Sequence, residues 1–371
     1  MAEPLKNHYG PDVPRRIASM IEAVHPAFPT AAFLDHALDG YEALELLPRG
    51  RRIAHSLHEF LPQNYEQAIN ILLASLGPRP ESQAGDGGMA PFLYLPHAHF
   101  VASYGLNDFE TSMRAQYELT QRFTCEFSIR PFLEQHREAT LVRLEAWTED
   151  PDEHVRRLVS EGTRTRLPWA SRLRDFQRDP TPVIDLLERL RDDPSLYVRR
   201  SVANNLNDIG KDHPKLLTDT ARRWARNASN QRHWIIRHAL RSAVKRGDPE
   251  ALEVLGYGEA PSVTIGEMRI DPSEAREGDR LRVEIDLHNG GKRTQALLAD
   301  LRVHYVKANG SQAPKVFKMK TLDLAPGESA TVGKTLSLAP MSTRRHYPGQ
   351  HDLELLLNGR SFPIGHFYFE D

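Results

Sequence analysis

The stretch DPDEHVRRLVSEGT, Asp150–Thr163, returns in altered form as DPSLYVRRSVANNL at Asp193–Leu206 and as NQRHWIIRHALRSA at Asn230–Ala243. One apolar residue of each copy defines the register, the sixth residue of the first two stretches and the seventh of the third, with separations of 43 and 38 residues: Val155, Val198 and Ile236. A period of about 40 residues with two helices per unit is typical of HEAT repeats, which stack into a superhelix with a concave surface. The repeat therefore predicts an all-α solenoid.

The solenoid is predicted to end at about Gly256, because apolar residues recur at intervals of three and four up to that point. From about Pro261 the pattern changes to alternation with a period of two, in six short segments: 262–270, 280–289, 299–308, 329–338, 351–358 and 363–370. Such segments, separated by turn signals such as NGGK and PGES, favour a β-sandwich of immunoglobulin type. The expected fold is multidomain: an all-α HEAT-like helical repeat domain at residues 1–256, then an all-β immunoglobulin-like sandwich domain at residues 261–371.

The composition is that of an ordinary globular protein, with 371 residues of which 40% are apolar and 26% charged. Cys125 is the single cysteine, and the first residues lack the apolar core of a signal peptide, so we expect a reducing cytosol and no membrane association. Residues 151–245 hold 20 Lys and Arg against 12 Asp and Glu, an excess that can steer a polyanion to one face. The segment ESQAGDGG, residues 81–88, is predicted to be a flexible surface loop.

Arginine follows the register position in each copy, and a polar residue lies six positions beyond it: Arg156, Arg199 and Arg237, then Glu161, Asn204 and Ser242. The polar row is a solvated surface, an amide ladder between repeats, or the wall of a groove for a polyanion. Guanidinium groups suit phosphate oxygens, which supply most of the affinity for DNA. For the groove hypothesis we expect these DNA contacts: Arg156, Arg157, Arg164, Arg166, Arg199, Arg200, Asn204, Arg237 and Arg241.

Two carboxylates and a tryptophan stand out beside these arginines. Glu161, in SEGTRTRLPWA (160–170), would repel phosphate, so its presence needs a reason. Glu126, in RFTCEFSIRPFL (122–133), has apolar neighbours that would disfavour its charged form unless a cation pairs with it, and Arg130 at i+4 is the expected partner. Trp169 is either a core residue or an exposed plate for stacking, whereas three others fall at positions interpreted as core: Trp147, Trp224 and Trp234.

Three motifs together resemble the AlkC branch of the AlkC/AlkD superfamily of DNA glycosylases: FTCEFSIRPFL (123–133), SEGTRTRLPWA and VRRSVANNLNDIGKDHP (198–214). The resemblance covers nearly the whole helical part, and the immunoglobulin-like domain is similar to one found in a subset of AlkC proteins. It implies a monofunctional enzyme that hydrolyses the N-glycosidic bond of cationic alkylated bases, 3-methyladenine and 3-methylcytosine, without placing the nucleotide in a deep pocket. It also implies no metal or nucleotide cofactor, and we expect a monomer whose partner is double-stranded DNA containing alkylated bases.

The resemblance makes Glu126, Glu161 and Trp169 the expected catalytic residues. A cationic base is already a good leaving group, so the remaining task is to stabilise an oxocarbenium-like sugar and to direct a water molecule at it. Glu126 is the preferred carboxylate because apolar neighbours strengthen its field. A tryptophan face attracts a cation by about 0.5–2 kcal/mol, so Trp169 would favour the charged lesion.

Other interpretations stay open beside this one. A non-catalytic HEAT scaffold that binds DNA or protein would make both glutamates dispensable. Asn204, Asn205 and Asp208 are as well suited to hydrogen bonds between repeats as to function. Lys292 and Arg293, in the NGGKR turn, either reach a DNA groove or have no role, and the His97–x–His99 spacing lacks the acidic or thiol partners of a metal site.

Overall fold

The computed structural model of the protein describes residues 4–79, 88–340 and 345–370, so the predicted surface loop at 81–88 lies outside the described residues except for Gly88. The chain divides into two compact units. One contains most of the chain up to His213 together with residues 228–239, and the other contains residues 214–227 and the chain from Leu240 onward. The boundary expected at residues 256–261 stays a prediction.

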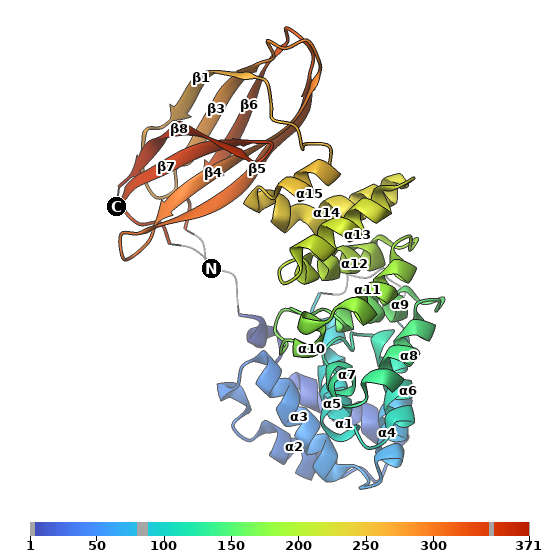
Figure 1. Cartoon of the computed structure of the whole chain (residues 1–371). Helices are drawn as coiled ribbons and strands as arrows, with labels where there is room; N and C mark the ends of the chain where they lie inside the picture. Colours follow the sequence, from blue (N-terminus) through green and yellow to red (C-terminus); the bar gives the residue numbers. More distant parts are fainter. Residues whose placement is uncertain (1–3, 80–87, 341–344, 371) are drawn as a thin grey trace. The chain divides into compact units, whose positions relative to one another are not determined.

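The first unit is helical (Figure 1). Its helices are α1 (Asp12–Val24), α2 (Thr30–Leu38), α3 (Leu46–Phe60), α4 (Tyr65–Ala74), α5 (Leu95–Tyr104), α6 (Phe109–Thr120), α7 (Arg130–Gln135), α8 (Arg137–Trp147), α9 (Glu153–Gly162), α10 (Arg174–Arg178), α11 (Thr181–Leu190) and α12 (Leu196–Ile209). Short 3₁₀ segments lie at Leu5–His8, Tyr41–Ala43 and Ala90–Tyr94. Helix α14 (Asn230–Arg246) begins in this unit and ends in the other.

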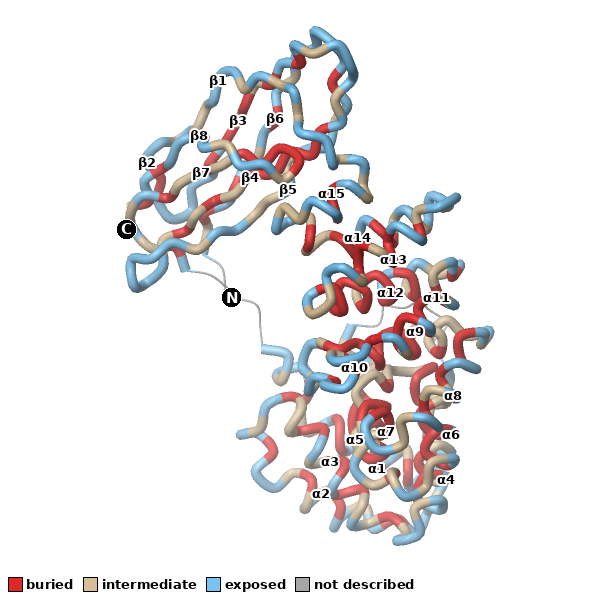
Figure 2. Tube along the Cα trace, in the orientation of Figure 1, coloured by how far each residue is buried: buried red, intermediate tan, exposed pale blue. Residues whose placement is uncertain are grey.

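The predicted repeat is confirmed in the helix pairs α8–α9 and α11–α12. Asp152 and Ser195, each directly after the proline of its Asp-Pro pair, cap α9 and α12 by accepting the N–H groups of His154 and Tyr197. Helix α9 packs against α12, and α8 packs against α11. The register residue Val155 is fully buried, as are its equivalents, and Figure 2 shows the buried stripe along these helices. This stacking fixes which side chains of α9 and α12 can meet.

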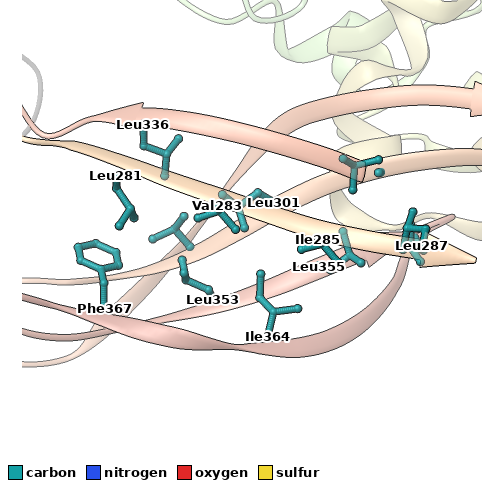
Figure 3. Close-up of a cluster of buried hydrophobic side chains, with 14 of the residues drawn as sticks. Leu281, Val283, Ile285, Leu287, Leu301, Leu336, Leu353, Leu355, Ile364 and Phe367 are labelled. Carbon is teal, nitrogen blue, oxygen red and sulfur yellow. The ribbon is translucent and has the colours of Figure 1, made fainter. Parts of the chain in front are cut away.

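The second unit contains α13 (Pro214–Ala225), α15 (Pro249–Val254) and two packed sheets. One sheet has the order β1 (Thr264–Asp271), β3 (Arg280–His288), β6 (Ser329–Ser337). The other has the order β2 (Glu274–Ala275), β8 (Arg360–Phe369), β7 (Gly349–Leu357), β4 (Gln295–Val306), β5 (Gln312–Leu324). Alternate residues of both sheets, among them Val283, Leu301 and Phe367, form the shared core (Figure 3). The predicted immunoglobulin-like sandwich is confirmed.

Strand β5 was not among the six predicted segments, which correspond to β1, β3, β4, β6, β7 and β8. It lies at the edge of its sheet and pairs with β4 alone. Its sequence, QAPKVFKMKTLDL, has a proline and three exposed lysines. Lysine and proline are typical of edge strands because they discourage pairing with another chain, and they hide the alternation that reveals an inner strand.

Candidate active site

Five charged side chains meet where α9 contacts α12 and the connection between α6 and α7: Glu126, Arg157, Glu161, Arg164 and Asp208. Arg157 and Glu161 share one face of α9, since they are four residues apart. Arg164 follows the end of that helix. We call these five residues the carboxylate cluster. Two successive repeats and the connection between α6 and α7 build it, so its geometry depends on how these segments pack.

The partner of Glu126 is Arg157, not Arg130. Arg157 Nη1 lies 2.7 Å from Glu126 Oε2, and the Thr124 hydroxyl donates to the same oxygen at 2.8 Å. The prediction of an i,i+4 pair with Arg130 was wrong because residues 126–129 form a turn and α7 begins only at Arg130. A helical spacing brings two side chains together only inside a helix.

Arg157 connects the two glutamates. Its Nη2 lies 3.7 Å from Glu161 Oε1, and its guanidinium carbon lies 4.9 Å from the ring centroid of Tyr197. Burial lowers the pKa of Arg157, but the carboxylates, first that of Glu126, outweigh burial and raise the pKa above its ordinary value. Arg157 is therefore a fixed positive charge shared by both carboxylates.

Glu161 is a buried carboxylate with a full set of donors. It is 6% exposed; Arg164 Nη1 donates to Oε1 at 2.6 Å and Ser201 Oγ donates to Oε2 at 2.6 Å. Burial raises the pKa of Glu161, but Arg157 and Arg164 outweigh it and hold the pKa below its usual range. These pairs explain how a glutamate is accommodated among arginines, and they keep Glu161 ionised at neutral pH.

Asp208 completes the cluster from α12. Arg164 Nε and Nη2 lie 2.8 and 2.7 Å from Asp208 Oδ2, and Lys211 Nζ donates to Oδ1 at 2.8 Å. Asn205 Nδ2, also on α12, donates to the Ser160 carbonyl at 2.8 Å. Asp208 and Asn205 thus make contacts between repeats, one of the two roles that the sequence left open for them.

Comparison with known proteins places this geometry in a family. Residues 122–243, which include the whole cluster, match the family model described as DNA alkylation repair enzyme. Residues 264–371 match the C-terminal Ig-like domain of the uncharacterised protein YhaZ. The uncharacterized protein YhaZ of Bacillus subtilis is 36% identical over 356 residues, which span 96% of each chain. The alkylpurine DNA glycosylase AlkC of Pseudomonas fluorescens, solved bound to DNA containing an abasic site analog, is 38% identical over 100% of both chains, with a TM-score of 0.92.

The chain belongs to the AlkC family of DNA alkylation repair proteins. The family expected from the sequence motifs is thereby confirmed. So is the arrangement of a helical repeat region followed by an immunoglobulin-like domain.

In this AlkC-family chain the arginine after the register position forms hydrogen bonds within its own copy of the repeat, in the first two copies. Arg156 Nη1 donates to the carbonyls of Asp150 and Pro151, and Arg199 Nη1 donates in the same way to those of Asp193 and Pro194. Each guanidinium thus ties its helix to the Asp-Pro turn that opens the same copy. The third member of the expected column, Arg237, is exposed, as is Arg200. Contacts of these arginines with DNA stay predictions.

The Trp169 side chain is exposed to solvent, so the alternative that Trp169 is a core residue was wrong. The side chain is 63% exposed, and its φ of 66° lies in the left-handed region that bulky residues rarely adopt. Such strain persists only where surrounding contacts hold it, and it is concentrated at functional sites. Arg166, in the same loop, pairs with Asp212, which also accepts from Gln177.

The tryptophans expected in the core differ from one another. Trp147 and Trp224 are buried as predicted, with 7% and 2% exposure. Trp234 is only half-buried and stacks on His238, with ring centroids 5.0 Å apart, while His238 Nε2 lies 3.1 Å from Asn204 Oδ1. The periodicity alone did not distinguish a buried face from a partly exposed one near the start of α14.

Arg130 holds the loop that carries Trp169. Its guanidinium donates to the carbonyls of Gly162 and Arg164 at 3.1 and 2.9 Å and also to that of Ser171. Arg130→Met would leave these buried acceptors without donors, so we expect the free energy of unfolding to fall by about 1–3 kcal/mol. Denaturant unfolding would measure it, with the exposed Arg172→Met as the control. Equal stability of the two variants would show that Arg130 does not anchor the loop.

The remaining predicted positions are a histidine pair in the first unit and two cations in the second. His97 and His99 lie in α5, where burial lowers the pKa of each to about 4. No group of three or more His, Cys, Asp or Glu side chains that could hold a metal ion occurs among the described residues. Lys292 and Arg293 are exposed in the turn between β3 and β4. No helix within the described ranges is long and apolar enough to cross a membrane.

Three contributors to the cluster were missed from the sequence. Thr124, Tyr197 and Ser201 contact the charged residues directly, and none was singled out. Ser201 could have been predicted to lie between the repeats, because it follows the buried register residue Val198 by three residues and so lies close to its face of α12. Thr124 had no such signal, since an irregular turn has no period, and the repeat pattern did not single out Tyr197 at the start of α12.

Proposed function

We propose that the protein is a DNA glycosylase that hydrolyses the N-glycosidic bond of cationic alkylated bases in duplex DNA, 3-methyladenine and 3-methylcytosine in particular. The observation that carries the proposal is the pair of carboxylates, Glu126 and Glu161, joined by the single guanidinium of Arg157. The similar AlkC bound to abasic-site DNA supports DNA as the partner.

The chemistry follows from charge. A cationic base departs with the electrons of the glycosidic bond and becomes neutral, so it needs no proton from the enzyme. Positive charge develops on the sugar instead, and a fixed carboxylate stabilises it. Water then adds to the anomeric carbon and gives its proton to a carboxylate. Because the pKa of Glu161 is lowered, that residue is ionised and cannot act as an acid toward the leaving base.

The two glutamates differ in what they can still bind. Both oxygens of Glu161 accept donors, and its side chain is 8% exposed. In Glu126, Oε2 takes both contacts, whereas Oε1 accepts no hydrogen bond within the described part of the chain. We therefore assign Glu126 to the sugar and the water, and Glu161 to holding Arg157 and Arg164 in place.

The proposed contacts with DNA phosphates are made by exposed cationic side chains. Arg200, Arg237, Lys292 and Arg293 are exposed. The arginines that are paired inside the repeats would instead shape the surface. Each lost phosphate contact would weaken binding to all sequences alike and reduce its dependence on salt. The product would be an abasic site in an intact strand.

The proposal is tested by comparing cationic with neutral lesions. Duplexes that contain 3-methyladenine or 3-methylcytosine are compared with duplexes that contain hypoxanthine or ethenoadenine, and released bases are quantified. We expect release of the cationic bases only, since a neutral base leaves readily only when an acid protonates it. Equal release of neutral bases would contradict the proposed chemistry, and binding without any release would favour a scaffold.

Trp169→Ala is expected to slow excision by about 2- to 30-fold, the equivalent of 0.5–2 kcal/mol of attraction between a cation and an aromatic face. Affinity for undamaged duplex should change less, because a normal nucleotide carries no such cation. Trp169→Phe keeps an aromatic face and serves as the control. Equal losses in excision and in binding to undamaged DNA would make Trp169 a general DNA contact instead.

A further inference from the structure

Thr124 precedes Glu126 by two residues, and its hydroxyl contacts both members of the Glu126–Arg157 pair. Thr124 Oγ1 donates to Glu126 Oε2 at 2.8 Å and accepts from Arg157 Nη1 at 3.2 Å. Arg157 Nη1 lies 2.7 Å from the same Glu126 Oε2. The hydroxyl therefore closes a triangle of contacts around one carboxylate oxygen.

The turn that carries this hydroxyl is anchored at Cys125. Cys125 is fully buried, and its N–H donates to Thr120 Oγ1 at 3.3 Å. Its carbonyl accepts from the N–H of Ile129 at 3.0 Å and from Ser128 Oγ at 3.2 Å. With the central residue fixed, the half-buried side chains of Thr124 and Glu126 are held close enough to bond.

These contacts decide which oxygen of Glu126 is available. A carboxylate that binds an arginine alone can turn until both of its oxygens face the two nitrogens of the guanidinium. The Thr124 hydroxyl opposes this rotation because it holds Oε2 in place. Oε1 then stays without a hydrogen bond from any residue that the structure describes.

We propose that Thr124 is a positioning residue that keeps Oε1 of Glu126 directed at the sugar and the attacking water. The inference rests on the proposed glycosylase function and deepens it. It predicts that the hydroxyl, rather than the methyl group or the shape of the threonine, sets the rate of excision.

Three variants separate the hydroxyl from the shape. Thr124→Val removes the hydroxyl and keeps the volume, and Thr124→Ser keeps the hydroxyl. Thr140→Val is the matched control, because Thr140 is buried in α8 and donates to the carbonyls of Phe132 and His136, away from the cluster. Each variant is measured for single-turnover release of 3-methyladenine, for affinity to abasic-site DNA and for its melting temperature.

We expect Thr124→Val to slow release by about 10- to 100-fold, the cost of a small misplacement at a reacting centre, with unchanged affinity and melting temperature. Thr124→Ser should restore most of the rate, and Thr140→Val should release the base as the wild type does. Wild-type rates in Thr124→Val, equal losses in the Val and Ser variants, or a loss matched by weaker DNA binding would each overturn the positioning role. Absence of release by the wild type would instead overturn the proposed function itself.

Discussion

Glu126→Gln is expected to slow single-turnover release of 3-methyladenine by about 10²–10³-fold, the range found when one group that stabilises transition-state charge is removed. Glutamine has almost the same shape as glutamate but carries no negative charge to oppose the developing sugar cation. Affinity for abasic-site DNA should not fall, since the change removes a negative charge near phosphate. Rapid-quench release and a binding titration would measure the two quantities.

The control for this variant is Glu134→Gln, which removes a nearby, exposed carboxylate. It should release base at the wild-type rate, because Glu134 makes no ion pair with the cluster among the described residues. Circular dichroism would establish that both variants fold. A Glu126→Gln variant as fast as Glu134→Gln would remove Glu126 from the mechanism.

Arg164→Met is expected to lower the free energy of unfolding by about 3–5 kcal/mol, the usual cost of breaking a buried ion pair by removing one partner. Arg164 pairs with Glu161 and with Asp208, which are 6% and 1% exposed, so the variant leaves two buried carboxylates short of a donor. Because Arg164 joins the end of α9 to α12, the loss should appear in the unfolding of the helical repeats. Thermal and urea unfolding would measure it.

Asp208→Asn in the Arg164→Met background provides the control, because it removes one of the two carboxylates left without a donor and should recover part of the loss.

The pH dependence of stability has a defined sign. Since the folded pKa of Glu161 is lowered, its contribution to stability is present above its unfolded pKa of about 4.3 and is lost as pH falls through the folded pKa. Arg164→Met should show a smaller acid loss than the wild type. Unchanged stability of the single variant would mean that the cluster does not join the repeats.

The sequence predicted the architecture well because both domains repeat a simple period. Val155 and Val198 lie at the same buried position, and the alternation of the six strand segments matches the inner faces of the sandwich. The predictions failed where a rule for regular helices or inner strands was applied to a turn or to an edge strand. The partner of Glu126 was wrong because the i,i+4 rule was applied across a turn, and β5 was missed because lysines at an edge obscure alternation.

The candidate site could be predicted only in part. Glu126, Glu161 and Trp169 were selected through the resemblance, while the residues alone left structural roles open for all three. Arg157 was expected to bind DNA, yet its position between two glutamates from separate segments required the folded chain. The role of Arg156 could have been predicted from the repeat. Its hydrogen bonds to the carbonyls of Asp150 and Pro151 recur at the same spacing in the next copy, where Arg199 makes them.

The central claim is that this chain cleaves the glycosidic bond of a cationic base. The most direct test incubates the wild-type protein with a duplex whose single alkylated base is 3-methyladenine and counts both free 3-methyladenine and alkali-labile sites. We expect equal amounts of the two, with the strand intact before alkali. DNA that is bound while neither free base nor abasic sites form would contradict the claim.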